Sequence, residues 1–491
     1  MATTELIYIN FTGGIVSPGY LKDVLEIAAA NKVTHASFGL LQQLMMDVPA
    51  KHFASFSKAC EEKNITFYKK KAALPNIVSS YTAAGIFTTD SWLREGVYKD
   101  VFNLFDYVPK LKINICDSTQ SFIPFFTGHL NWISSDSPHF WYLYVRLPKS
   151  QTVICWPELV YTNDLPLLSR LLEQYLLNGG KSNLNTLYKK IKPTISYIAK
   201  TIDKEMELPK FSLPYYEGFN KHENSWWLGI YRRDELFQVQ FLLDLCSICL
   251  QLKIGELYTT PWKSIIIKGI QTTQRNLWDY TLGHYRINVR HAANELNWQV
   301  EDYDEEGLML KRHIIRYFDK EDVRTFGLSF AVQTNSTSNL FGSVIIRKQQ
   351  LKNSNRLKSL DRFDILHTSD FNPNSANLVI YRQDVEKEYL GVYLVSLCKF
   401  FYETQSIKKA VSLETVHLPV NNIDNTAITK KIFQCTHCFT IYDEAAGDVE
   451  NNIAAGTSFS DLPESYHCPL CEFGKDDFVA IDENSLELQG A

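Results

Sequence analysis

The sequence contains no apolar run as long as the roughly 18–20 residues that a membrane-spanning helix needs. The stretch ELFQVQFLLDLCSICLQLKI, for example, is interrupted by charged residues and by glutamine. The first residues, MATTELIYINFTGG, lack the basic segment and following apolar segment that mark a secretory signal. These absences predict a soluble, cytoplasmic protein that does not insert into a membrane, and no nucleic-acid partner is expected.

The composition has no extreme that would mark an unusual class of protein. Hydrophobic residues make up 45% of the chain and charged residues 21%, which is ordinary for a globular protein. Because 491 residues are too many for one ordinary core, two large units and a small one are expected. The aromatic share of 13% is on the rich side and favours units that contain sheets.

Disulfides are not expected, although the chain has ten cysteines. Four cluster near the C-terminus, and six are scattered through apolar contexts: Cys60, Cys116, Cys155, Cys246, Cys249 and Cys398. Cys246 and Cys249 form a C-x-x-C within the helical apolar stretch LLDLCSICLQL. Buried core cysteines are the favoured interpretation of this pair, and a redox or metal pair is the alternative.

Basic residues are almost missing from the last part of the chain. Residues 435–491 contain twelve Asp and Glu but a single basic residue, Lys475, which gives a net charge of −11. Since the whole chain carries −5, residues 1–434 carry about +6. An acidic end beside a mildly basic body suggests docking, either within the chain or on a basic partner.

One order of elements occurs twice in the sequence. The first copy is a helix at 18–32, a strand–bend–strand at 33–49 and the helix KHFASFSKACEEKN. About 220 residues later come a helix at 234–253, a strand–bend–strand at 255–270 and the helical TTQRNLWDYTLG. This repetition predicts an internal duplication of an α+β unit, and chance similarity of helices and strands is the alternative.

The four clustered cysteines follow the pattern C-x2-C-x29-C-x2-C, at Cys435, Cys438, Cys468 and Cys471. Two C-x2-C turns supply four soft thiolates in a tetrahedral arrangement, which suits iron or zinc.

The sequence around these cysteines resembles rubredoxin over residues 433–480. The matching features are IYDEAAGD after the first C-x-x-C, then AGTSFSDLPESYHCPLC and KDDF. The resemblance implies one iron, held by the four cysteines and cycling between ferric and ferrous, with no position open for a substrate. It also implies an aromatic core made by Phe433, Tyr442, Phe459, Tyr466 and Phe478, with Tyr466 where the family usually has tryptophan.

Two positions depart from the rubredoxin pattern. Phe439 and Glu472 follow the second cysteine of each turn, where the family usually has a glycine in a left-handed conformation. The alternative to an iron site is a structural zinc ribbon without a redox role, and the long x29 segment favours iron. His437 and His467 lie beside the ligands and are interpreted as surface groups.

The front of the chain, residues 1–410, resembles the sirohaem nitrite and sulfite reductases. GELYTTPWKSIIIKGI is similar to a strand–turn–strand that holds the sirohaem carboxylates in that family. LPNIVSSYTAAGIFTTDSW and VPKLKINICDSTQSF look like the two segments that carry cluster cysteines there.

The ligands that this resemblance requires are missing. The family needs C-x5-C and C-x3-C, but the first segment has Ser79, Ser80 and Tyr81, and the second keeps Cys116 alone. In place of further ligands, the second segment has Ser118 and Phe122. Sirohaem and a [4Fe–4S] cluster are therefore not expected in the body.

Some charged residues remain in the second copy. Lys263 and Lys268, with Arg275 nearby, are interpreted as solvated side chains, and residual anion binding is the alternative. The acidic segment at 301–307, EDYDEEG, is interpreted as a solvated turn.

The expected fold class is α+β: a duplicated ferredoxin-like, sulfite-reductase-like body followed by a small rubredoxin domain. The expected divisions are a first half at 1–210, a second half at 211–410, a linker at 411–432, the rubredoxin domain at 433–480 and an acidic tail at 481–491.

The favoured function is electron transfer by a single iron, with a cofactor-free body that docks a protein redox partner. The body's resemblance suggests a partner from nitrite, nitrate or sulfite assimilation. No catalytic residue is assigned, because an electron carrier is favoured over a complete enzyme. Two alternatives remain: a reductase whose body binds its own cofactor, and an interaction protein with a structural zinc site.

Overall fold

The computed structural model describes residues 3–482, except for several short segments and a longer one before the last domain. Outside the described residues lie 71–72, 89–90, 148–151, 179–183, 336–339, 350–360, 376, 416–430, 438–439, 445–446, 449–450, 452, 455 and 470–472. The chain forms two compact units, Met1–Lys408 and Lys409–Ala491. We call the first unit the body.

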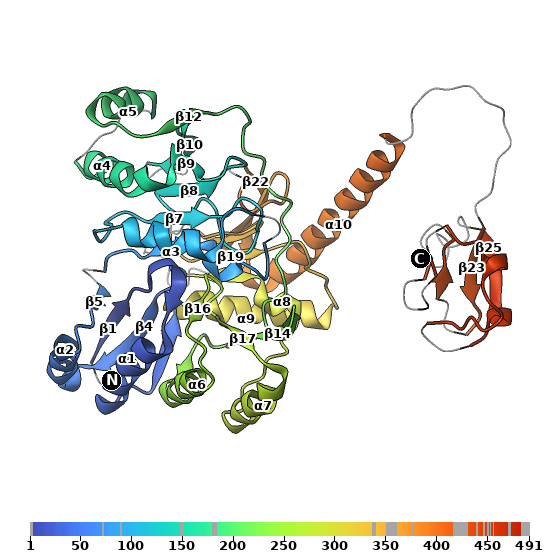
Figure 1. The fold of residues 1–491 in the computed structure, drawn as a ribbon, viewed down its shortest axis with the longest axis horizontal. Coiled ribbons are helices and arrows are strands. Elements are labelled where there is room, and N and C mark those ends of the chain that lie inside the picture. Colours follow the sequence, from blue (N-terminus) through green and yellow to red (C-terminus); the bar gives the residue numbers. More distant parts are fainter. Residues whose placement is uncertain are drawn as a thin grey trace. The chain divides into compact units, whose positions relative to one another are not determined.

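The expected duplication is confirmed by the order of the elements (Figure 1). The first copy opens with β1 (Thr4–Ile9), α1 (Pro18–Ala30), β3 (His35–Phe38), β4 (Leu44–Pro49) and α2 (Phe53–Glu62). The second copy opens in the same order with β14 (Ser225–Ile230), α6 (Val239–Gln251), β16 (Leu257–Thr259), β17 (Ile265–Ile270) and α7 (Arg275–His284).

The two copies exchange edge strands. One sheet has the order β15-β3-β4-β1-β5, in which β15 (Phe237–Gln238) comes from the second copy and β5 (Tyr68–Lys69) from the first. The other sheet is β13-β14-β17-β16-β2, in which β13 (Gly218–His222) belongs to the second copy and β2 (Ile15–Val16) to the first. Helices α1 and α6 pack together over a shared core, so the two copies fold as one structure.

A second type of sheet follows in each copy. In the first copy it contains β6 (Ile77–Ser79), β7 (Ile113–Cys116), β8 (Leu130–Ser134), β9 (Phe140–Arg146), β10 (Val153–Cys155), β11 (Glu158–Tyr161) and β12 (Ala199–Thr201). In the second copy it contains β18 (Trp298–Val300), β19 (Phe330–Gln333), β20 (Val344–Lys348), β21 (Arg362–Thr368) and β22 (Leu378–Glu386). Both sheets begin with three parallel strands and continue antiparallel, so the duplication extends through the body.

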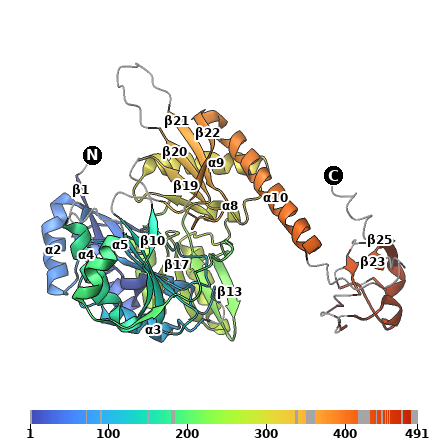
Figure 2. The same cartoon turned by 90° about the horizontal axis from the view of Figure 1, so that it is seen from above.

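Helices accompany both of these sheets. The first copy has α3 (Glu95–Leu104), α4 (Leu165–Leu177) and α5 (Leu184–Ile191), and the second has α8 (Ala293–Leu296), α9 (Glu305–Lys320) and α10 (Leu390–Thr415). Figure 2 shows α9 and α10 beside the sheet β18–β22. Because α10 runs to Thr415, the first residues of the expected linker are helical, and residues 416–430 lie outside the described part.

Local signals explain where the helices begin. Helix α1 starts at Pro18, and the side chain of Ser17 accepts a hydrogen bond from the Tyr20 amide at 3.2 Å. Helix α9 starts after Asp304, whose Oδ1 accepts from the Gly307 amide at 3.0 Å. The segment at 301–307 is therefore not simply a solvated turn, because part of it caps a helix.

The C-terminal unit contains a three-stranded sheet in the order β24-β23-β25. Its strands are β23 (Lys431–Cys435), β24 (Ile441–Tyr442) and β25 (Phe478–Asp482), and all pairs are antiparallel.

A search of the described helices finds none with the length and hydropathy that crossing a membrane would require.

Candidate metal centre

The C-terminal unit is built around aromatic side chains, as the sequence predicted. Tyr442, Tyr466, Phe459 and Phe478 are buried, and Phe433 packs against them. Phe433 and Phe459 stack with their ring centroids 4.0 Å apart, and Phe459 lies 5.5 Å from Phe478. Such a small unit has little aliphatic interior, so these rings supply most of its apolar burial.

Two of the four predicted metal ligands lie at equivalent points of two similar turns. Cys435 ends β23 and is fully buried, and Cys468 is 1% exposed. The Cys435 amide donates to the Thr440 carbonyl at 2.9 Å, and the Cys468 amide donates to the Phe473 carbonyl at 2.8 Å. Each turn is thus closed by a bond to the fifth residue after its first cysteine.

Cys438 and Cys471, together with Phe439 and Glu472, lie outside the described residues. Within the described part of the chain, no three His, Cys, Asp or Glu side chains form a group that could hold a metal. The predicted set of four cysteines therefore stays a prediction.

The donor chemistry of the described residues fits a soft metal ion. Both described sulfurs belong to the aromatic core and are shielded from solvent. Thiolates are the ligands that tetrahedral iron and zinc sites prefer. Each of the two cysteines donates the backbone hydrogen bond that closes its own turn.

Hydrogen bonds hold the segment between the two turns in place. Tyr466 donates from its hydroxyl to Asp448 Oδ2 at 2.9 Å. Burial, and then the neighbouring Asp448 carboxylate, raises the pKa of Tyr466, so the phenol stays a donor at neutral pH. Glu444 Oε1 accepts from the Phe459 amide at 2.8 Å, and Lys475 donates to the Leu462 carbonyl at 2.7 Å.

The two histidines next to the cysteines are exposed, as expected for surface groups. The His437 ring stacks on Phe473 with centroids 3.6 Å apart, and its Nε2 lies 3.3 Å from Asp477 Oδ1. Because His437 belongs to the first turn and Phe473 closes the second, this stack links the two turns at the surface.

The two segments of the body that resemble cluster-binding segments are tightly packed. Ser80 is buried, and its Oγ accepts from the Asp117 amide at 2.7 Å and lies 2.6 Å from the Tyr98 hydroxyl. Cys116 is fully buried next to the Pro124 carbonyl, and burial raises the pKa of its thiol. A protonated thiol in such a place behaves as a small apolar side chain.

The retained basic residues are not the solvated side chains that the sequence suggested. Lys263 is 4% exposed and forms ion pairs with Glu235 at 2.6 Å and Asp302 at 3.4 Å. Lys268 donates to the Ala84 carbonyl at 2.7 Å. The expectation was wrong because the carboxylates that surround Lys263 lie 28 and 39 positions away in the sequence.

Arg275 also has a partner within the body, since its guanidinium lies 4.3 Å from the centroid of the Trp226 ring. The paired cysteines of α6 follow the prediction: Cys246 and Cys249 are fully buried, and burial raises the pKa of Cys246 to about 12.

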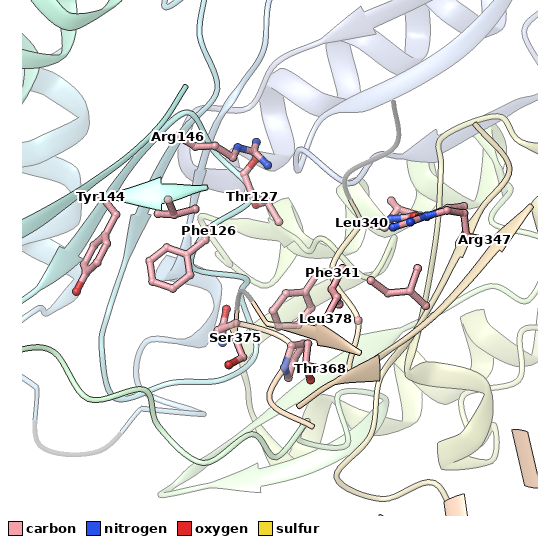
Figure 3. Close-up of a pocket in the computed structure, with 16 residues that line it drawn as sticks. Phe126, Thr127, Tyr144, Arg146, Leu340, Phe341, Arg347, Thr368, Ser375 and Leu378 are labelled. Atoms are coloured by element: carbon pink, nitrogen blue, oxygen red, sulfur yellow. The ribbon is translucent and has the colours of Figure 1, made fainter. Parts of the chain in front are cut away.

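The body also contains a cavity of about 240 Å³ that no motif indicated (Figure 3). Its walls include Arg146, from β9, and Arg347, from β20. Neither residue belongs to a recognisable sequence motif. The sequence feature that could have indicated the cavity is an arginine near the end of a mostly apolar strand, which occurs in both β9 and β20.

Comparison with known proteins agrees with the geometry of the C-terminal unit. The Rubredoxin family model matches residues 432–478. Rubredoxin from Megasphaera elsdenii is 52% identical over 50 residues, which cover 94% of that protein and 10% of this chain. Rubredoxin-2 from Chlorobaculum tepidum is 47% identical over 49 residues, again 94% of that protein and 10% of this chain. Through its C-terminal domain, the chain belongs to the rubredoxin family.

A longer relative matches in the same region. The high molecular weight rubredoxin from Moorella thermoacetica is 50% identical over 58 residues, or 12% of this chain. The match spans a quarter of the length of that relative.

The body has a solved structural neighbour, the NirA protein of Mycobacterium tuberculosis. The superposition has a TM-score of 0.60 and covers 79% of each chain, at 12% sequence identity. The predicted reductase-like fold is therefore confirmed: a rubredoxin domain follows a body with a sulfite-reductase-like fold.

Proposed function

We propose that this chain is an electron-transfer protein that holds one iron ion through Cys435, Cys438, Cys468 and Cys471. The observation that carries the proposal is the pair of equivalent turns, each opened by a buried cysteine and closed by the same backbone hydrogen bond. The family match over these residues supports iron as the metal.

The bound iron supplies one-electron chemistry between its ferric and ferrous states. The protein side chains set the conditions for it. Four thiolates leave no position for a substrate, and the aromatic core keeps water away from the described sulfurs. The turn residues would place backbone amides near sulfur and so tune the reduction potential.

We further propose that the body carries no redox cofactor and docks a protein redox partner. Serine and tyrosine stand where cluster cysteines would be required, and their hydrogen bonds are made within the protein. The charge of the C-terminal part, −11, favours contact with a basic surface. Cytoplasmic location and a partner from nitrite, nitrate or sulfite assimilation belong to the same proposal.

One observation favours a second candidate, a reductase whose body binds its own cofactor. The body has a cavity of about 480 Å³, whose walls include the cations Lys70 and Lys112 and the acids Glu301 and Asp302. Its fold is also that of NirA. In this candidate the rubredoxin domain would pass electrons to a cofactor within the same chain.

Metal analysis and visible spectroscopy of the full chain test these candidates. We expect one iron per chain in protein from iron-replete cells, with a red absorption that dithionite bleaches. The substitution Cys468→Ser should abolish this absorption, and the matched control Cys155→Ser, in the body, should retain it. Stoichiometric zinc without colour would contradict the electron-transfer proposal, and tetrapyrrole bands would favour the second candidate.

A further inference from the structure

The cavity of about 240 Å³ in the body lies between segments that are far apart in the sequence (Figure 3). One wall comes from the first copy, through Phe126, Thr127 and residues of β9. The opposite wall comes from β20 and from the connection between β21 and β22. The cavity thus lies where the two copies meet, away from the cysteines of the C-terminal domain in sequence.

Two arginines face this cavity from its opposite walls (Figure 3). Arg146 is 6% exposed, and its Nη2 donates to the Thr127 carbonyl at 2.6 Å. Arg347 is half-buried and donates from Nε to Gln333 Oε1 at 2.9 Å. For neither guanidinium does a carboxylate of the described residues come within 4.0 Å. A guanidinium has five N–H donors, so both retain capacity for an anion.

The surrounding groups do not neutralise Arg146. Burial lowers its pKa to about 10, which leaves it cationic at neutral pH. Burial, together with the charges of Arg146 and Lys112, lowers the pKa of His129 to about 4, so this imidazole is neutral. Asp364 lies opposite Arg347 in the strand register, but its Oδ1 accepts from Gln349 and from the Asp384 amide. An uncompensated buried cation is costly, and an anion would offset that cost.

Two further polar groups in the cavity wall lack partners among the described residues. Asn374 is 6% exposed, and its Oδ1 accepts from the Phe125 amide at 3.1 Å. This bond fixes the orientation of the amide and leaves Nδ2 unpaired. Thr368 is 1% exposed, and its Oγ1 is also unpaired. Buried polar groups are normally hydrogen-bonded, so these two unpaired atoms are exceptions, and a bound head group would supply their missing partners.

The remaining walls are apolar and aromatic. Phe126, Leu340 and Phe341 line the cavity, and Phe126 packs against Tyr144 with ring centroids 5.0 Å apart. The volume exceeds the roughly 150 Å³ of an apolar cavity that accepts benzene. There is therefore room for one ring and a charged head group.

We infer that this cavity binds a small aromatic carboxylate. The carboxylate lies between the guanidinium groups of Arg146 and Arg347, where bidentate hydrogen bonds form. Asn374 Nδ2 and the Thr368 hydroxyl donate to the same head group, and the ring packs against Phe126 and Phe341. The site uses none of the four predicted iron ligands and goes beyond the electron-transfer proposal.

Calorimetric titration of the full chain with benzoate tests the inference. We expect saturable binding of one benzoate per chain, and binding of the neutral isostere benzamide should be at least about tenfold weaker. Inorganic phosphate should not compete, because it lacks the ring. Absence of benzoate binding, equal binding of benzamide, or tighter binding of phosphate would overturn the inference.

Variants assign the binding to this cavity. Arg347→Gln and Asn374→Asp should each weaken benzoate binding by about tenfold or more, the second because it replaces a donor by a negative charge. Arg316→Gln removes an exposed arginine of α9 and should bind as the unaltered chain does. Circular dichroism identifies any variant that has not folded. If Arg347→Gln does not fold, the benzoate affinity of Asn374→Asp tests whether the ligand binds in this cavity. Unchanged affinity in a folded variant would place the ligand elsewhere.

Discussion

At the scale of single residues, this protein buries several polar and charged side chains. The pair Lys263–Asp302, the phenol of Tyr466 and the guanidinium of Arg146 are each held by specific neighbours or left facing a cavity. Such groups are costly to bury, so each should have a measurable effect on stability or binding.

Tyr466→Phe should destabilise the rubredoxin domain. The substitution removes the hydrogen bond to Asp448 and leaves a carboxylate with one donor fewer, at a cost of about 1–2 kcal/mol. The measurement is urea unfolding of the iron-loaded chain, monitored through the loss of its visible absorption. The same midpoint as in the unaltered chain would show that this bond contributes little.

Lys311 should make the stability of the body depend on pH. This side chain is 3% exposed and donates to the Tyr231 hydroxyl at 2.9 Å, and burial lowers its pKa to about 8. In the unfolded chain the pKa is about 10.4. Between these values the unfolded state binds more protons, so this group's contribution to stability increases as pH rises.

The substitution Lys311→Met should remove that increase. The free energy of unfolding in urea is measured at pH 7.5 and at pH 9.5 for both chains. Its increase between the two pH values should be ~1–2 kcal/mol larger in the unaltered chain than in the variant. An equal increase in the two chains would mean that Lys311 is not the group responsible.

At the scale of elements, the helix caps and edge strands decide how the body is assembled. Asp304 caps α9 and also accepts from Thr334 Oγ1 at 2.5 Å. Its neighbours in sequence are acidic as well, so the sequence alone could not separate the cap from its solvated surroundings.

Asp304→Ala should therefore destabilise the body by about 1–2 kcal/mol, through loss of the cap. Asp304→Asn is the matched control, because asparagine caps helices about as well as aspartate does. Thermal or urea unfolding measures both variants. If the two variants lose the same stability, the carboxylate charge matters more than the cap.

At the scale of the whole molecule, the chain divides into two compact units with different chemistry. The sheet and aromatic core of the C-terminal unit are complete within that unit. The small rubredoxins that it matches are covered almost entirely by the aligned residues.

A fragment that begins near residue 428 should thus bind iron without the body. We expect the same visible spectrum and the same metal content as in the full chain. A fragment that binds no metal, while the full chain does, would show that the body is needed to form the site.

The sequence by itself determined the rubredoxin domain and its expected ligands, because its contacts lie within about fifty residues and its cysteines have a fixed local spacing. It also predicted the duplication, since helical and strand periodicities survive divergence. The burial of Lys263 could not be predicted, because its partners come from other elements, and neither could the contact between Thr334 and Asp304, which are thirty positions apart.

Only the tertiary structure reveals the exchanged strands and the cavity where the two copies meet. The exchange of β2 and β15 pairs residues more than two hundred positions apart, and the cavity joins Arg146 to Arg347 over a similar separation. Such contacts depend on how the sheets pack, and packing responds to the shapes of many side chains together rather than to any local pattern.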